Sequence, residues 1–366
     1  MPRSGCRASV SSRRSTWTRS SGSCNPNSPP RGTRMSTVDM TVQTPLSPDR
    51  LPPPIIEPVE EARIVPVEQD EGLGCGVFRP DGSFCELSRT RISDDRFTAQ
   101  PALPDMRDAA RLEGTYLFGG LGRHHFGHFL MESIARVWAM DGRYERFDGL
   151  IMLPFQQTDF GSVLRRRLLA FFEIMGVDMP LHLVKVPLVA ERLLIPAQGF
   201  GHQDWASGTE EFRTYVRGRI AANCPAQGPE KIYISRSKLK HGHQKVDQEE
   251  RIERMMRAAG YEIFHPQRHS IAAQIRVYRA AKVIVGGDGS AFHMVPFAMR
   301  EGARIGLIQR RARDRAVQAI ANQITAFEKV KLTRIDALTG TARHSGLPDP
   351  MDIAALQAQL SETGFI

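Results

Sequence analysis

Three polar residues at helical spacing have the side-chain types that general acid–base chemistry needs. His128, Glu132 and Arg136 follow one another at intervals of four residues in the segment RHHFGHFLMESIARVW. Side chains four residues apart share one face of an α-helix, and apolar residues at 126, 130, 134 and 137 form a stripe on the opposite face. The spacing therefore predicts a helix over 126–140 whose polar face presents an imidazole, a carboxylate and a guanidinium.

This polar face has three interpretations. Either Glu132, the first choice, or His128 is a general base, and the other residue orients it. Alternatively, His124, His128 and Glu132 together bind a metal ion, although the sequence has no HExxH signature. In the third interpretation the face is an ordinary polar surface, and Glu132 forms an ion pair with Arg136. The spacing is compatible with all three.

A glycine-rich turn is the second candidate site. Residues 286–290 (GGDGS) follow an apolar run that is expected to be a strand and precede a helix expected over 291–299. Glycines let a ligand approach the backbone, and amides at the start of a helix favour phosphate. Gly289 and Ser290 are therefore candidate phosphate ligands, and Asp288 would orient Ser290 or contact a sugar. The alternative is a tight turn in which Asp288 or Ser290 merely caps the helix.

A basic segment, 236–245 (RSKLKHGHQK), directly follows a strand expected over 231–235. Parallel strands bring their carboxyl ends to one edge of a sheet, so this segment is expected to lie on the same edge as the glycine-rich turn. Arg236 is the best placed candidate for a diphosphate because its planar fork matches phosphate geometry, and Lys238 is the second. The alternative is a solvated loop with scattered charge.

The elements that must position these residues alternate between strand-like and helix-like segments from Gly114 onward. Alternation with short connections predicts parallel strands in doubly wound sheets. Two such domains, joined near 223–230 (NCPAQGPE), would face a cleft at the carboxyl ends of their strands, where ligands of open α/β sheets bind. The predicted organisation is a tail or leader over 1–50, a short β-rich N-terminal extension over 51–112, one α/β domain over 113–228, a second over 229–310, and C-terminal helices over 311–366.

Composition and charge exclude several classes of protein. The 366 residues are 41% apolar and 24% charged, which is typical of a globular protein. The net charge is +9, but residues 1–34 contain seven arginines and no Asp or Glu, so the rest of the chain carries only +2. We expect no nucleic-acid partner, because such a partner needs a basic patch on a folded face. Residues 1–34 are expected to be disordered, and Met35 is expected to be the true start of the protein.

Membrane and redox features are few. No apolar run approaches the roughly 20 residues that cross a bilayer, so no integral span is expected, and peripheral contact with the inner membrane stays open. The five cysteines lack zinc-ligand spacing, and their odd number makes a poor disulfide framework. These features indicate a reducing compartment, and we expect a cytoplasmic protein.

Four motifs resemble, in the same order, those of glycosyltransferase family 61, which includes bacterial capsular-polysaccharide proteins, plant xylosyltransferases and animal O-linked N-acetylglucosaminyltransferases. Residues 125–136 (HFGHFLMESIAR) resemble its N-Y-x-H-W-L-x-D-x-L-P-R motif, and residues 232–236 (IYISR) resemble its y-I-S-R strand. Residues 247–261 resemble the N-E-x-E…G-F segment, and residues 274–292 resemble E-Q…A-x-x-I-I-G-x-H-G-S-A-L. The resemblance extends over about residues 113–310.

Four of the positions at which the sequence departs from the family motifs bear on the chemistry. Glu132 stands for the motif Asp, Phe129 for the Trp, Asp288 for the His before Gly-Ser-Ala, and Met294 for an Asn in the following helix. Glu132 keeps the carboxylate and moves it by one methylene. Asp288 removes a cation near the donor phosphates and adds a negative charge, a change that would alter donor choice or weaken activity.

The resemblance implies an inverting glycosyltransferase with two Rossmann-like domains facing a cleft, a GT-B-like fold. The N-terminal domain would bind a glycan or lipid-linked glycan acceptor and the C-terminal domain a nucleotide-sugar donor, in polysaccharide biosynthesis. Arginine and helix-dipole groups would replace a metal ion, so neither a metal nor a further cofactor is expected. The alternative is a non-catalytic or degenerate glycan- or nucleotide-binding relative. Two residues would be catalytic, Glu132 and His128, and five would hold the donor: Arg236, Lys238, Gly289, Ser290 and Asp288.

Overall fold

The computed structural model describes residues 50–68, 73–141, 146–155, 169–327 and 330–366. These residues all belong to one compact unit, Val38–Ile366. They form an α/β structure with two sheets, one of six strands and one of five, so the predicted fold class is confirmed at this level. The expected N-terminal tail and the expected start at Met35 lie outside the described residues, apart from Arg50.

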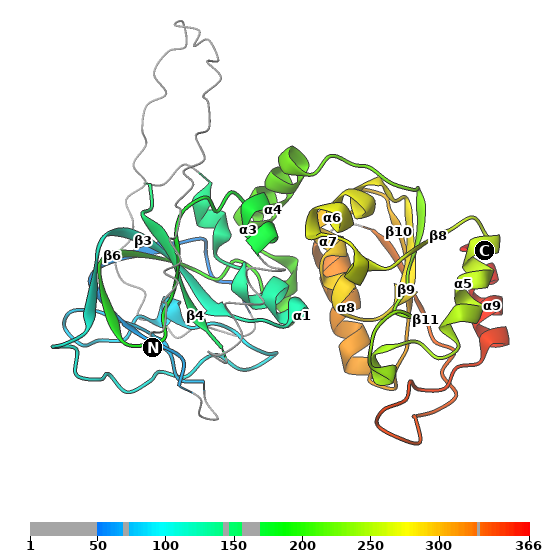
Figure 1. Cartoon of the computed structure of the whole chain (residues 1–366), viewed down its shortest axis with the longest axis horizontal. Helices are drawn as coiled ribbons and strands as arrows, with labels where there is room; N and C mark the ends of the chain where they lie inside the picture. The colour runs from blue at the N-terminus through cyan, green and yellow to red at the C-terminus, as the bar shows by residue number, and fades with distance from the viewer. Residues whose placement is uncertain (1–49, 69–72, 142–145, 156–168, 328–329) are drawn as a thin grey trace, which may run out of the picture. The chain divides into compact units, whose positions relative to one another are not determined.

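The first sheet has the strand order β2-β1-β6-β3-β4-β5 (Figure 1). β3 pairs in parallel with β6 and with β4, and β4 pairs in parallel with β5. β1 is antiparallel to both of its neighbours, β2 and β6. The sheet is therefore parallel-rich with an antiparallel edge, and its strands are β1 (Ile56–Val65), β2 (Gly76–Phe78), β3 (Ala110–Gly122), β4 (Gly149–Pro154), β5 (Leu181–Leu183) and β6 (Leu188–Pro196).

The β-rich segment that the sequence predicts before the first α/β region is built into this sheet. β1 pairs with β6 from Ile56 opposite Pro196 to Ile64 opposite Leu188. Val59 and other buried residues of β1 pack in one apolar cluster with residues of β3, β4 and β6. The extension therefore shares a core with the strands that precede the site.

The second sheet has the order β11-β10-β9-β7-β8, and all neighbouring strands are parallel. The chain starts at β7, adds β8 on one side and then adds β9, β10 and β11 on the other. In sheets of this kind, ligands bind outside the carboxyl ends of the strands where the winding reverses, which here is between β7 and β9. The strands are β7 (Lys231–Ile234), β8 (Glu262–Phe264), β9 (Val283–Gly287), β10 (Arg304–Ile308) and β11 (Lys331–Ile335).

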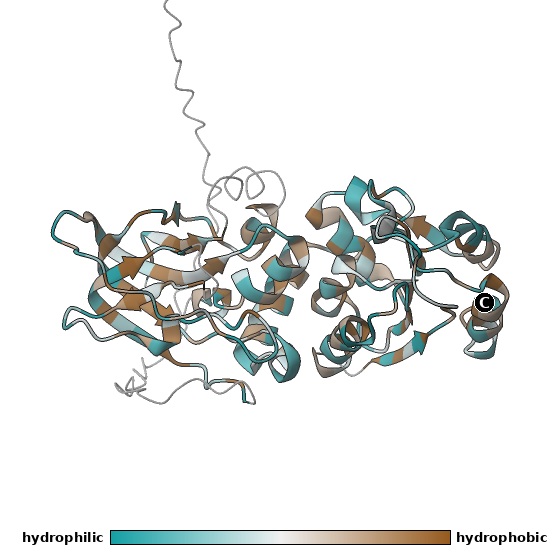
Figure 2. Cartoon of the chain, turned by 90° about the horizontal axis from the view of Figure 1, so that it is seen from below, coloured by the Kyte–Doolittle hydropathy of each residue, from teal (hydrophilic) through white to brown (hydrophobic). Residues whose placement is uncertain are grey.

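Helices cover both faces of the second sheet (Figure 1). An apolar cluster lies on each face, one beneath α5 and α9 and the other beneath α6, α7 and α8. Hydrophilic residues lie on the outer surfaces of several of these helices (Figure 2). This is the doubly wound arrangement that the strand–helix alternation predicts, with α5 (Glu249–Ala258), α6 (Ile271–Ala280), α7 (Val295–Ala298), α8 (Asp314–Phe327) and α9 (Ile353–Glu362).

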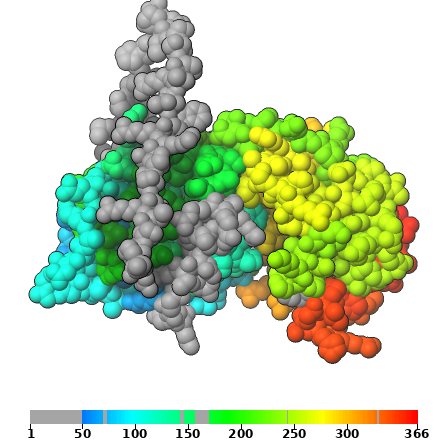
Figure 3. Space-filling view, in the orientation of Figure 1, coloured from blue at the N-terminus to red at the C-terminus, as the bar shows by residue number. Residues whose placement is uncertain are grey.

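The C-terminal residues complete the second sheet. Only helices are expected from the sequence after residue 310, but β11 adds an edge strand beside β10. The loop before α9 lies against the segment after β7 (Figure 3). The backbone N–H of Met351 donates to the carboxylate of Asp247, and the side chain of Gln248 donates to the carbonyl of Met351. These contacts tie the C-terminus to the segment that carries Arg236.

Among the described residues, no helix is both long and apolar enough to span a membrane. Cys75, Cys85 and Cys224 are buried free thiols. Burial raises the pKa of both Cys75 and Cys85 to about 12. Thiols with so high a pKa are unreactive at neutral pH, so these cysteines have a packing role.

Candidate active site

The segment after β3 does not form the continuous helix predicted over 126–140. It begins as a single turn, α1 (Phe126–His128), continues as a π-helix over Phe129–Ser133 and ends as a 3₁₀-helix over Val137–Met140. A π-helical turn is wider than an α-helical turn and offsets the side chains that a regular helix would align. Residues 129–139 are also all buried, so Glu132 and Arg136 do not lie on the surface, and the interpretation of this face as an ordinary polar surface is wrong.

Glu132 is the centre of a hydrogen-bonded cluster with two histidines. Its side chain has 0% exposure. Its Oε1 lies 2.5 Å from Nδ1 of His128 and 3.1 Å from Nε2 of His202. Nε of Arg123 lies 3.3 Å from the other carboxylate oxygen, Oε2. We call His128, Glu132 and His202 the imidazole cluster.

The environment of Glu132 keeps it ionised. Burial acts to raise the pKa of Glu132, but hydrogen bonds from His128 and His202 and the positive charge of Arg123 outweigh that effect and hold the pKa below its usual value. The carboxylate has no exposed surface, whereas the His128 side chain is 39% exposed. Only the imidazole of this pair is therefore accessible to a substrate, and Glu132 is placed to orient it.

His202 is the member of the cluster that the helix spacing could not identify. It lies 70 residues after Glu132 in sequence, just before a 3₁₀-helix over Gln203–Ser207. Only the folding of the β6–α4 loop brings it to Glu132, where α4 is the helix Glu210–Asn223. Local spacing carries no signal for a contact of this range.

The expected ion pair between Glu132 and Arg136 is wrong. Arg136 is buried, and its Nε donates to the carbonyl of Pro196 at 3.0 Å. Its Nη2 donates to the carbonyls of Leu87 and Arg89 at 2.9 and 2.6 Å. Burial lowers the pKa of Arg136 to about 10, so it stays a cation at neutral pH. Its role is to tie the site segment to the N-terminal extension, because the π-helix turns it away from Glu132.

The imidazole cluster also contains a donor set that metals accept. Ligand atoms of His128, Glu132 and His202 lie within 4.8 Å of one another, so His202 takes the position that the sequence analysis gives to His124. Two ligands of a tetrahedral zinc ion lie roughly 3.4 Å apart, since each bond is about 2.1 Å long. The 2.5 Å between Nδ1 of His128 and Oε1 of Glu132 is shorter and is a hydrogen-bond distance. With Arg123 adding positive charge at Glu132, this geometry fits a hydrogen-bonded cluster better than a metal centre.

The imidazole cluster forms the first side of the site. Arg236, which lies over the glycine-rich turn, forms the second side. Its Nε donates to the carbonyl of Gln244 at 2.5 Å, and its backbone N–H donates to Oε1 of Glu249 at 2.7 Å. A Cβ on Gly289 would overlap Nη1 of Arg236. Any side chain at 289 would therefore require the guanidinium of Arg236 to move from this position.

The helix predicted over 291–299 is replaced by two short pieces, a 3₁₀-helix over Ser290–His293 and α7. Pro296 has no backbone N–H to donate to the carbonyl of Phe292, so an α-helix cannot run through this point. The expected contribution of a helix dipole therefore falls to that of a single turn. Ser290 and Gly289 still line the cavity described below.

Asp288 faces the residues after β10. Its carboxylate has 0% exposure and accepts from the backbone N–H of Arg310 at 2.8 Å and from Nε of Arg311 at 3.0 Å. Its carbonyl accepts from Nε of Arg310 at 2.6 Å. Lys238, by contrast, is exposed and does not line the cavity, and its charge acts on Glu253. The structure thus brings Asp288 to two arginines that the sequence analysis did not consider, and it leaves Lys238 outside.

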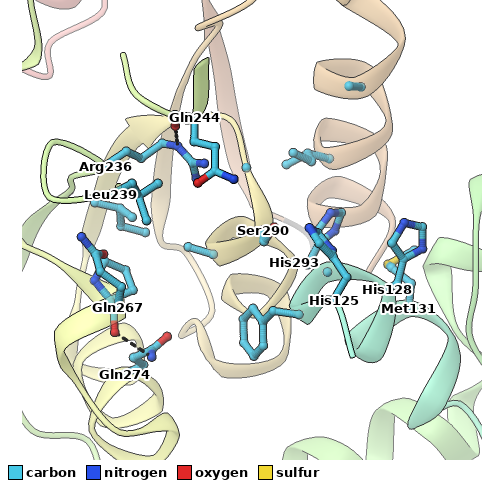
Figure 4. Close-up of a pocket in the computed structure, with 18 of the residues that line it drawn as sticks. His125, His128, Met131, Arg236, Leu239, Gln244, Gln267, Gln274, Ser290 and His293 are labelled. Atoms are coloured by element: carbon cyan, nitrogen blue, oxygen red, sulfur yellow. Dashed lines mark hydrogen bonds between the residues drawn. The ribbon is translucent and has the colours of Figure 1, made fainter. Parts of the chain in front are cut away.

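One cavity of about 1070 Å³ brings both sides together. A cavity of this size is large enough for a ligand as big as a nucleotide sugar. Ser290 and His293 lie between Arg236 and the histidines of the segment after β3 (Figure 4). The charged and imidazole side chains in the wall are Asp94, His124, His125, His128, His202, Arg236, Arg268, His269, His293, Arg310 and Arg311.

Residues 126–306 match the family model described as Glycosyltransferase 61. The chain belongs to the glycosyltransferase 61 family. No curated protein matches the sequence significantly. Family membership implies transfer of a sugar from a donor to an acceptor, and the matched region contains His128, Glu132, Arg236 and Ser290.

His293 is a further cavity residue of this glycosyltransferase that the sequence analysis missed. Its Nδ1 lies 2.5 Å from Oε1 of Gln323, and Nε2 of Gln323 donates to the carbonyl of His293 at 3.1 Å. This pairing places a proton on Nδ1 and leaves Nε2 as an acceptor. Burial and the nearby His202 and His128 lower the pKa of His293 to about 4, although the hydrogen bond to Gln323 acts in the opposite direction. The imidazole is therefore neutral at pH 7.

Proposed function

We propose that this glycosyltransferase moves a sugar, with inversion, from a nucleotide-sugar donor to a hydroxyl of a glycan or lipid-linked glycan in polysaccharide biosynthesis. One observation carries the proposal. A single cavity holds a partly exposed imidazole anchored by a buried carboxylate, and it also holds a guanidinium at the point where the second sheet reverses. Inverting transfer needs a base for the acceptor hydroxyl and positive charge for the departing diphosphate, and these groups meet both needs.

The donor site is assigned to the carboxyl ends of β7 and β9. Arg236 follows β7, and Gly289 and Ser290 follow β9. A guanidinium can hold phosphate oxygens through two parallel N–H donors. The Ser290 hydroxyl and the backbone of the turn add further donors. In this proposal Arg236 takes the place of a divalent cation at the diphosphate.

The base is assigned to His128, with Glu132 as its orienting residue. When Nδ1–H of His128 donates to Glu132, the lone pair of Nε2 is left to accept a proton. The hydroxyl proton passes to Nε2 while the hydroxyl oxygen bonds to the anomeric carbon. The bond from that carbon to the diphosphate breaks on the opposite face, and its electrons leave with the nucleoside diphosphate. The ionised Glu132 stabilises the imidazolium that forms.

The proposal is tested with the full chain, a panel of nucleotide sugars and a panel of oligosaccharide acceptors. Release of nucleoside diphosphate and the mass of the product report transfer, and NMR of the new linkage reports the anomeric configuration. We expect one donor series to react with inversion and chelator to leave the rate unchanged. Arg236→Ala should raise the donor KM more than tenfold, because a charge-assisted hydrogen bond contributes about 1.5–3 kcal/mol. Lys240→Ala removes an exposed cation from the same segment and is the matched control.

Three results would contradict parts of the proposal. Binding of a donor without turnover with any acceptor would identify a non-catalytic relative. Loss of activity with chelator, restored by zinc or another divalent ion, would make the imidazole cluster or the donor site a metal site. A product with retained configuration would exclude the single displacement assigned to His128.

A further inference from the structure

Three guanidiniums gather around the turn after β9. Arg236, Arg310 and Arg311 all line the cavity that also includes Gly289 and Ser290. We call them the arginine cluster. Arg310 and Arg311 follow β10 and lie beyond residue 306, where the family match ends. They are therefore a feature that the matched motifs do not assign.

Asp288 and the turn at residues 286–290 hold the arginine cluster in place. The Asp288 carboxylate binds the backbone N–H of Arg310 and Nε of Arg311, and it is fully enclosed. A Cβ added to Gly287 would lie 3.6 Å from Cδ of Arg310 and 3.7 Å from Cδ of Arg236, so both side chains pass over this glycine. The turn thus aligns two arginines side by side, and Asp288 fixes the third beside them.

Among the described residues, the wall of this cavity carries more cationic than anionic side chains, with four arginines (Arg236, Arg268, Arg310 and Arg311) and one carboxylate, Asp94. Burial and the positive charge of Arg236 lower the pKa of Arg310 to about 10, and burial also lowers that of Arg236, so both remain charged at pH 7. Glu249, whose charge acts on Arg236 and Arg310, has a pKa raised by burial to about 7, so only part of its negative charge is present at that pH. An enclosed excess of positive charge favours an anionic ligand with more than one negative charge.

We propose that Asp288 is a positioning residue that fixes Arg310 and Arg311 beside Arg236, and that these two arginines bind the diphosphate of the donor. The inference rests on the proposed function and extends its donor site. It also gives a positioning role to Asp288, which stands where the family motif has His. The carboxylate adds one negative charge, but it holds two cations in the cavity wall, so the donor site keeps a net positive charge.

The test measures the affinity of the full chain for inorganic pyrophosphate by isothermal titration calorimetry, since pyrophosphate contains the shared diphosphate and no nucleoside or sugar. We expect Arg310→Ala, Arg311→Ala and Asp288→Asn each to weaken binding about tenfold or more. Arg313→Ala is the matched control, because Arg313 is exposed, lies two residues beyond Arg311 and does not line the cavity. It should change the affinity less than twofold.

The Asp288→Asn variant separates positioning from simple charge. Removing a negative charge next to an anion should strengthen pyrophosphate binding if charge alone matters. Loss of affinity is expected only if the arginines lose their positions. The double variant Asp288→Asn/Arg311→Ala extends the test, since a residue that acts partly through Arg311 costs less in its absence than in its presence. Stronger binding by Asp288→Asn, or full additivity of the two changes, would overturn the positioning role.

The outcomes also separate this inference from the proposed function. If Arg236→Ala weakens pyrophosphate binding while Arg310→Ala, Arg311→Ala and Asp288→Asn do not, the donor site stands and the extended cluster is wrong. If the unmodified chain binds neither pyrophosphate nor any nucleoside diphosphate, the donor site itself is wrong. Circular dichroism and thermal midpoints of each variant identify one that fails to fold, and Arg311→Ala, whose side chain is partly exposed, keeps the test valid if Asp288→Asn unfolds.

Discussion

Each of the two sides of the cavity is organised by a buried carboxylate, but the partners of that carboxylate differ between the sides. Each has one carboxylate with 0% exposure at its centre, Glu132 on the first side and Asp288 on the second. Glu132 holds the imidazoles of His128 and His202, whereas Asp288 holds the guanidinium of Arg311 and the backbone of Arg310. A buried charge must be paired, so each carboxylate fixes the groups around it.

The difference between the partners determines what each side can do. An imidazole nitrogen can accept a proton and donate it again, so the imidazole cluster can exchange protons with a substrate. A guanidinium stays protonated under all physiological conditions, so the arginine cluster can hold an anion but cannot act as a base. In the proposed mechanism, the first side therefore takes the acceptor proton and the second stabilises the leaving group.

Replacement of His128 should have the largest effect on turnover. His128→Ala removes the accessible base, and loss of a general base lowers the rate by about 10²–10⁴-fold. The measurement is kcat with a fixed donor and acceptor, together with the affinity for nucleoside diphosphate, which should stay unchanged because the second side is intact. His344→Ala, at an exposed histidine outside the cavity wall, is the matched control. Equal loss of nucleoside diphosphate affinity would mean that the two sides are not separable.

Replacement of Glu132 should have the next largest effect. Glu132→Gln keeps a hydrogen-bond acceptor for His128 but removes the charge that stabilises an imidazolium, and we expect a fall in kcat of about 10²-fold. The order of the two variants decides the assignment of the base. A larger loss for Glu132→Gln than for His128→Ala would make Glu132 the base, as the sequence analysis first expects. Full turnover by Glu132→Gln would remove Glu132 from the mechanism.

Some parts of the site could be predicted from the sequence, and others could not. The two strands of the second sheet that lead into the site, β7 and β9, could be predicted from apolar runs, and the positions of Arg236 and Ser290 at one sheet edge follow from those strands, whereas the edge strand β11 was not predicted. His128 and Glu132 lie four residues apart, so their pairing could be predicted from helical spacing. Arg136 was placed wrongly because a π-helical turn depends on packing by the rest of the core, and a pattern with a period of 3.6 residues does not contain it.

Contacts over long sequence distances were beyond the reach of spacing. His202 reaches Glu132 across 70 residues, and Asp288 reaches Arg311 across 23. The partner of Asp288 also depends on the register of β9 beside β10, where Gly287 lies opposite Ile308. The family resemblance identified the substituted position, Asp288, but only the structure identifies what the substitution binds.

A smaller effect is expected from Gly289, which tests the second side alone. Gly289→Ala would overlap the guanidinium of Arg236 and displace it from the turn. We expect about tenfold weaker binding of pyrophosphate, the cost of one charge-assisted contact, with little change in the protonation chemistry of the first side. Gly218→Ala is the control, since no atom of the described residues lies within 4 Å of a Cβ at that position in α4. It should leave pyrophosphate binding unchanged and increase stability by about 0.5–1 kcal/mol. Unchanged binding by Gly289→Ala would show that the guanidinium does not need its observed position.

The smallest effect concerns His293, which lies between the two sides and belongs to neither cluster. Its pKa of about 4 lies below the ordinary value of 6.5, so the unfolded chain takes up a proton on this residue between pH 6.5 and 4 and the folded chain does not. The stabilisation from neutral His293 is therefore complete above pH 6.5 and is lost as the pH falls toward 4. Between pH 7 and 5 the loss is about 2 kcal/mol, or roughly 2–4 °C in the thermal midpoint. His293→Gln should reduce the fall in midpoint by that amount, whereas His344→Gln, at an exposed position, should leave it unchanged. If the unmodified chain and both variants show the same pH dependence, His293 is protonated as readily in the folded cavity as in water. Its position between the imidazole cluster and the arginine cluster would then not keep it neutral.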